Sequence, residues 1–112
     1  MNKQVKPMFS ESVLEDLKLK YPYGLRILEI YPDEDAKDPL KYIVKKPSKS
    51  LVYLLSSKEY EGNMQASSEV MLSNCVLAGD MEALEQDASV FSELVSRIGE
   101  MMKSARSELK KV

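Results

Sequence analysis

The sequence contains no histidine and a single cysteine, Cys75, among its 112 residues. Without an imidazole, no Ser-His or Cys-His nucleophile pair and no histidine proton shuttle can form within the chain. One cysteine cannot form an intramolecular disulfide, and without histidine the usual ligands of a structural zinc site are missing. These absences favour an intracellular protein that is not an enzyme and uses no metal or other cofactor.

An excess of basic charge and long apolar runs are also absent. Sixteen Lys and Arg face 18 Asp and Glu, a net charge of −2, so composition gives no reason to expect nucleic-acid binding. The basic N-terminal segment is followed by Phe9 and Ser10 rather than by an apolar run, which is unlike a signal peptide. No stretch is long enough to span a bilayer, so we expect a cytoplasmic protein without membrane contact.

Apolar residues make up 44% of the chain, enough for the core of one domain over residues 1–112. We expect an α+β fold in which residues 1–9 are a flexible N-terminal segment. A helix is predicted over about 10–20, because Ser10 is a good N-cap and Val13, Leu14 and Leu17 recur at helical spacing. Two strands, near 25–31 and 40–46, form an antiparallel hairpin around an exposed acidic loop at 32–39.

After Pro47 the apolar residues follow helical spacing. Helices are predicted from Ser48 or Ser50 to near Tyr60, over about 65–78 and over about 88–109, with a short helical turn between 80 and 86. Gly99 lowers the stability of the last helix by up to about 1 kcal/mol relative to alanine, which a packing contact would justify.

The acidic loop and a run of lysines are candidate ligand sites. Asp33, Asp35 and Asp38 suggest calcium, but the spacing fails the EF-hand pattern, and a solvated loop explains them. The lysine run adjoins Tyr42 and Tyr53, and it indicates either a phosphate-facing patch or the protection of an exposed strand against aggregation. Its members are Lys41, Lys45, Lys46 and Lys49.

Cys75 lies on the apolar face of the helix predicted over 65–78. A free thiol in such a place behaves as a small hydrophobe, and no basic residue is close in sequence to stabilise a thiolate. We therefore predict that Cys75 is buried and unreactive.

The last helix carries the longest apolar stripe and two of the seven methionines. Methionine adapts to varied apolar partners, and the apolar helical faces exceed what a two-stranded sheet can cover. The stripe therefore indicates either core packing or a contact surface for a protein partner or a second copy of the chain. The candidate contact residues are Phe91, Leu94, Ile98, Met101 and Met102.

The order of features over residues 25–105 resembles that of the small tail-assembly chaperones of tailed bacteriophages. The matching features are a hairpin, the junction Lys45-Lys46-Pro47-Ser48, a helix ending in Leu72-Ser73-Asn74-Cys75-Val76-Leu77-Ala78-Gly79-Asp80, an acidic spacer and an amphipathic final helix. The N-terminal helix has no counterpart in this pattern.

The resemblance implies a non-enzymatic protein of the bacterial host cytoplasm. Such a protein keeps the long, apolar, helical tape-measure protein, or another tail protein, soluble until the tail assembles. The sequence leaves two alternatives open: a phage or mobile-element regulator that binds nucleic acid through the four lysines, and a structural tail component.

Overall fold

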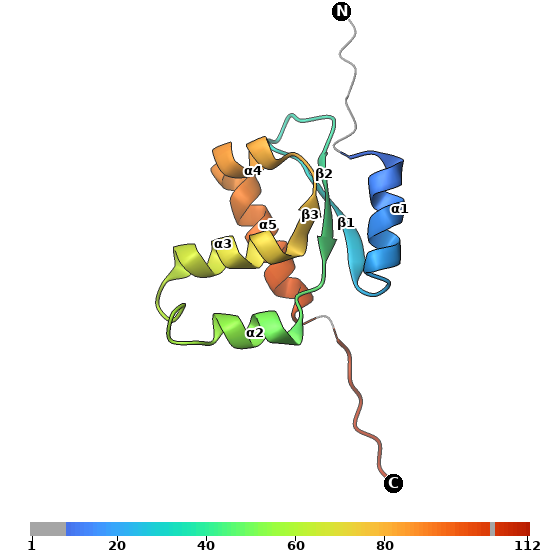
Figure 1. Ribbon diagram of the computed structural model, residues 1–112, viewed down its shortest axis with the longest axis vertical. Coiled ribbons are helices and arrows are strands. Elements are labelled where there is room, and N and C mark those ends of the chain that lie inside the picture. The colour runs from blue at the N-terminus through green and yellow to red at the C-terminus, as the bar shows by residue number, and fades with distance from the viewer. Residues whose placement is uncertain (1–8, 104) are drawn as a thin grey trace, which may run out of the picture.

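The computed structural model describes residues 9–103 and 105–112. It has the predicted α+β architecture: an N-terminal helix, an antiparallel hairpin and a helical C-terminal half (Figure 1). The expected flexible segment lies, apart from Phe9, outside the described residues. In chain order the elements are α1 (Glu11–Lys20), β1 (Leu25–Ile30), β2 (Leu40–Lys45), α2 (Lys49–Leu55), α3 (Met64–Cys75), β3 (Val76–Ala78), α4 (Met81–Gln86) and α5 (Ala88–Met101).

The sheet has three strands in the order β1-β2-β3, so the prediction of a two-stranded sheet is incomplete. Strands β1 and β2 pair antiparallel from Leu25 opposite Lys45 to Ile30 opposite Leu40. Strand β3 occupies residues that we assigned to the end of a helix. It pairs antiparallel with β2, and a β-bulge shifts the register between the pairs Val44–Val76 and Ile43–Ala78.

Gly79 allows β3 to lie close against β2. Its φ of +143° is one that other residues rarely adopt, and a Cβ there would lie 2.9 Å from the Lys41 carbonyl oxygen and would meet the Tyr42 ring. On the next residue, the Asp80 carbonyl accepts a 2.7 Å hydrogen bond from the Tyr42 hydroxyl. These contacts end the helical conformation before Val76 and hold β3 on the sheet.

Besides α3, which ends at Cys75, two other helices are shorter than predicted. Helix α2 ends at Leu55, followed by turns and by Gly62 with φ +74°. Helix α5 ends at Met101 rather than near residue 109, and residues 105–112 have no regular secondary structure and are exposed. A short helix without tertiary packing is marginal in water, and nothing in the described part of the chain covers Leu109.

Each helix begins at a side chain that accepts a backbone N–H. Ser10, the predicted N-cap of α1, accepts from Val13, and Asp87 starts α5 by accepting from Ser89 and Val90. Hydrogen bonds from the Ser89 side chain and backbone lower the pKa of the Asp87 carboxyl. Local capping therefore sets where the helices start.

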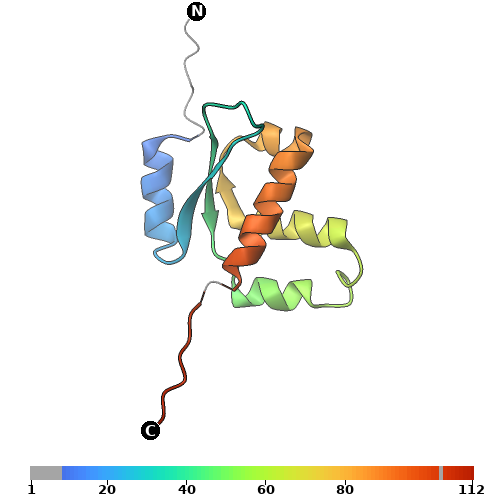
Figure 2. The same ribbon diagram turned by 180° about the vertical axis from the view of Figure 1, so that it is seen from behind.

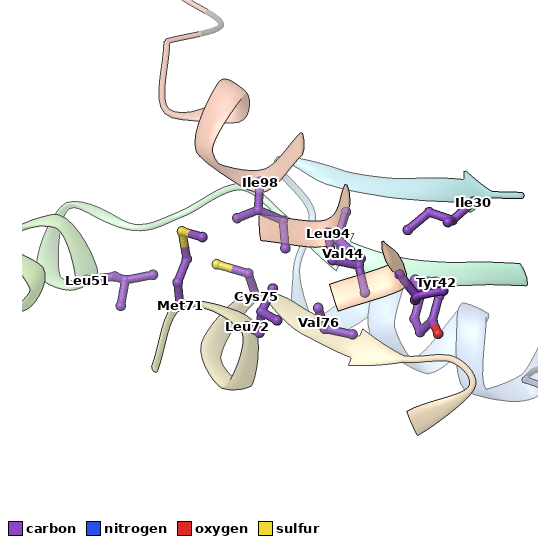
Figure 3. Packing of buried hydrophobic residues seen from close by; sticks show 11 residues of the cluster. Ile30, Tyr42, Val44, Leu51, Met71, Leu72, Cys75, Val76, Leu94 and Ile98 are labelled. Atoms are coloured by element: carbon purple, nitrogen blue, oxygen red, sulfur yellow. The ribbon is translucent and has the colours of Figure 1, made fainter. Parts of the chain in front are cut away.

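The main core lies between one face of the sheet and helices α3 and α5 (Figure 3). Tyr42 and Val44 of β2 face this core, which also contains Leu94 and Ile98 of α5 and Leu51 of α2. Burial raises the pKa of the Tyr42 hydroxyl to about 12, and Asp80 and Asp87 add to this effect. No polar side chain is buried among the described residues without a hydrogen-bond partner.

The opposite face of the sheet is covered by α1, which lies across the strands from α3, α4 and α5 (Figures 1 and 2). Ile43 points to this face and is fully buried. The Lys45 ammonium lies 4.9 Å from the centre of the Tyr21 ring, and the Lys46 N–H donates to the Gly24 carbonyl at 3.0 Å. These contacts join the end of α1 to the end of β2.

Helices long and apolar enough to cross a membrane are absent from the described part of the chain.

Candidate functional site

One concave feature of the described surface is a groove lined mainly by α3 and α4, which we call the α3–α4 groove. Its volume is about 570 Å³. Both α3 and α4 contact α5, a helix whose buried residues belong to the main core. Its lining residues come from four elements: Glu69, Leu72 and Ser73 of α3, Val76 of β3, Met81, Leu84 and Glu85 of α4, and Phe91 of α5.

The floor of the groove is apolar. Leu72 and Val76 are buried at its base and belong to the main core, while Leu84 and Phe91 are half-buried. Met81 is 43% exposed, so its flexible thioether side chain remains available to another molecule. The floor is therefore a partly exposed extension of the core.

The rim of the groove is acidic. Glu69 and Glu85 are exposed, and no lysine or arginine lines the groove. Among the residues that the structure describes, neither carboxylate forms an ion pair; Glu69 accepts only a long 3.4 Å hydrogen bond from the Gln65 amide. The surrounding segment, residues 59–100, has nine acidic residues and one basic residue, a net charge of −8. The groove therefore favours apolar groups flanked by positive charge.

The five predicted contact residues of the last helix do not form one surface. Leu94 and Ile98 are 0% exposed in the main core, so for these two residues the structure shows the core-packing alternative. Phe91 lines the groove. Met101 and Met102 lie at the far end of α5, about 15 Å along the helix from Phe91 at 1.5 Å per residue.

The residues that line the groove fall in the sequence into two sets with helical spacing. Positions 69, 72, 73 and 76 follow the spacing i, i+3, i+4, i+7, and positions 81, 84 and 85 follow i, i+3, i+4. Each spacing identifies one wall. Only the three-dimensional structure shows that the two walls face each other.

The four predicted basic residues are divided between the two ends of β2. Lys41 lies at one end, 3.7 Å from Glu29, whereas Lys45, Lys46 and Lys49 lie at or beyond the other. The fold brings Lys20 to this second group, because both Lys20 and Lys45 lie over the Tyr21 ring, at 5.6 and 4.9 Å. Lys49 lies 5.7 Å from the Tyr53 ring.

The acidic loop, residues 32–39, joins β1 to β2 and is largely exposed, as predicted. Asp33 accepts the Asp35 N–H at 2.9 Å, a short-range hydrogen bond that shapes the turn. Within residues 9–103 and 105–112, no three acidic or cysteine side chains are grouped as metal ligands would be.

Cys75 is fully buried, as predicted. Burial raises the pKa of its thiol, although the positive charge of Lys45 acts in the opposite direction. Sequence reasoning found no basic neighbour because Lys45 is 30 positions away along the chain. Its low reactivity stays a prediction.

Searches with this chain against protein-family models, curated proteins and solved structures each found no match. The resemblance to tail-assembly chaperones therefore rests on the residues named above.

Proposed function

We propose that this chain is a non-enzymatic binding protein that shields an apolar helical segment of a protein partner. Its role is that of a tail-assembly chaperone in the bacterial cytoplasm, with a tape-measure-type protein as the partner. The observation that carries the proposal is the α3–α4 groove, with its apolar floor and acidic rim.

The shape of the groove suits a helix. Two helices form its walls, so a partner helix can lie between them with apolar side chains at i, i+3, i+4 and i+7 on the floor. Glu69 and Glu85 would then attract lysine or arginine on the flanks of that helix. Met81 can adapt to different apolar side chains, which suits a partner of repetitive helical sequence.

A labelled amphipathic peptide tests this binding mode, with leucine at i, i+3, i+4 and i+7 and lysine on its flanks. Fluorescence anisotropy measures its affinity for the full chain. Met81→Glu places a charge at the groove, and we expect at least about a tenfold weaker affinity, equivalent to about 1.4 kcal/mol.

Met64→Glu is the matched control for this variant. Met64 also occupies the first position of a helix, but it is 82% exposed and lies outside the groove. Equal affinities for both variants would exclude the groove as the binding site. Co-expression with the tape-measure protein of the same genome then tests the chaperone role, because wild type and Met64→Glu should keep that protein soluble and Met81→Glu should not.

Nucleic-acid binding is the second candidate function, and the cluster of Lys20, Lys45, Lys46 and Lys49 beside Tyr21 and Tyr53 favours it. Lysines with adjacent aromatic rings are typical of single-strand binding. Affinity for a single-stranded oligonucleotide that falls steeply with salt and is lost in Lys45→Glu/Lys46→Glu would support this function.

A further inference from the structure

The C-terminal segment, residues 105–112, is an apolar and basic stretch that is exposed throughout and has no packing partner in the part of the chain that the structure describes. Leu109 and Val112 are fully exposed, and the segment has no regular secondary structure. Yet Ala105, Leu109 and Val112 follow the spacing i, i+4, i+7, which would place them on one side of a helix. The segment therefore has a helical sequence pattern and lacks the contact that would stabilise a helix.

The charge of this segment is opposite to that of the groove. It contains Arg106, Lys110 and Lys111 against one acidic residue, Glu108. The groove carries Glu69 and Glu85 on its rim and no basic residue in its lining. The segment thus has both properties of a groove ligand: an apolar stripe and flanking positive charge.

The segment is too short to reach the groove of its own chain as a helix. The chain leaves α5 at the end away from α4, beside α2 (Figures 1 and 2). Returning about 15 Å along α5 to the level of Phe91 takes about five extended residues. Starting from Lys103, this leaves only residues 108–112, which excludes Ala105 and is little more than one helical turn.

We propose that residues 105–112 of one copy of this chain bind, as a helix, in the α3–α4 groove of a second copy. Leu109 and Val112 lie on the apolar floor, and the basic residues face Glu69 and Glu85. Two reciprocal contacts of this kind close a symmetric dimer. This inference rests on the proposed function, because the C-terminal segment and the partner helix use the same groove. The segment must therefore leave the groove before a partner helix binds.

Sedimentation equilibrium of the full chain tests the dimer. We expect the mass of the wild type to rise from monomer to dimer between low and high micromolar concentration. Leu109→Asp should remain monomeric, with the circular dichroism spectrum of the dilute, monomeric wild type, because Leu109 has no contact to lose in the monomer. The matched control is Leu19→Asp, which changes another largely exposed leucine, in α1, and should dimerise like the wild type.

A charge exchange identifies the two surfaces. Glu69→Lys/Glu85→Lys and Lys110→Glu/Lys111→Glu should each fail to self-associate, and mixing the two variants should restore the dimer mass. A wild type that stays monomeric at every concentration would overturn the proposal. So would a Leu109→Asp variant that still dimerises, or an exchanged pair that does not associate.

The amphipathic peptide separates this proposal from the proposed function. If both hold, Leu109→Asp binds the peptide more tightly than the concentrated wild type, because its groove is vacant. If the wild type dimerises, Leu109→Asp does not, and Leu109→Asp fails to bind the peptide, the result supports the contact between two copies and contradicts the proposed function. A monomeric wild type that binds the peptide as tightly as Leu109→Asp contradicts the self-contact alone.

Discussion

The two faces of the sheet are covered to different degrees. On the main face, α5 contributes three fully buried residues, Val90, Leu94 and Ile98, which pack with Tyr42 and Val44. On the other face, α1 has no buried residue, although Ile43 beneath it is fully covered. Both helices have a polar N-cap, so capping does not distinguish them. From this difference we expect burial on the main face to supply most of the stability, and α1 to open at a lower free energy than α5.

Truncating a core leucine of α5 tests this comparison most strongly. Leu94→Ala should reduce the free energy of unfolding by about 2–5 kcal/mol, because it leaves a cavity in the main core. Leu17→Ala makes the same change at a half-buried position of α1, and we expect a loss of about 1 kcal/mol. Urea denaturation measures both, and equal losses would break the comparison.

Gly79→Ala tests how closely β3 must lie against the main face. The new methyl group would meet the Tyr42 ring and the Lys41 carbonyl at a positive φ, so we expect a loss of about 2–4 kcal/mol in unfolding free energy. Gly62→Ala is the control, since Gly62 also has a positive φ but its Cβ would meet nothing within 4 Å. If both substitutions have the same effect, backbone strain rather than close packing explains the loss.

The hydroxyl of Tyr42 links the main face to the start of α4 and responds to pH. Because its pKa is raised to about 12 from an ordinary value near 10, the neutral folded form is favoured. This contribution to stability is complete below pH 10 and is lost as the pH rises through 12.

Tyr42→Phe isolates this group. We expect it to lower the free energy of unfolding at neutral pH by about 1 kcal/mol, because the hydrogen bond to the Asp80 carbonyl is lost. We also expect the free energy of unfolding of this variant to decrease less between pH 10 and 12 than that of the wild type. Tyr21→Phe, on the other face, should retain the steep alkaline fall of the wild type. Thermal unfolding across this pH range measures the effect. The prediction is contradicted if Tyr42→Phe loses as much stability between pH 10 and 12 as the wild type.

Local patterns predicted the elements whose residues interact with near neighbours in sequence. Ser10 and Asp87 start helices through hydrogen bonds within three residues, and strands β1 and β2 follow from their β-branched and alternating residues. Strand β3 was not predicted because three residues are too few to show the alternation of a strand. Their conformation depends on pairing with Val44 and Ile43, more than 30 positions away.

The candidate site shows the same limit. The apolar stripe of α5 has the same periodicity whether it faces a core or a partner, so spacing left both alternatives open for Leu94 and Ile98. The groove depends on residues of α3, α4 and α5 meeting at one place in the fold, which no local pattern specifies. Phe91 was a candidate because it belongs to the stripe and it also lines the groove, whereas Glu69 and Glu85 come together at the rim only through the fold.

Gly99 tests whether all of α5 is closely packed, and it should show the smallest effect. We considered that a packing contact would justify a glycine here, but a Cβ at this position would meet nothing within 4 Å. Alanine should therefore fit and stabilise the helix by about 0.5–1 kcal/mol, because it reduces the entropy lost on folding. Ser96→Ala, at an exposed position of the same helix, should give a smaller gain. A loss of stability in Gly99→Ala would mean that the tight packing of the main face extends to this turn of α5, and would extend the contrast with α1.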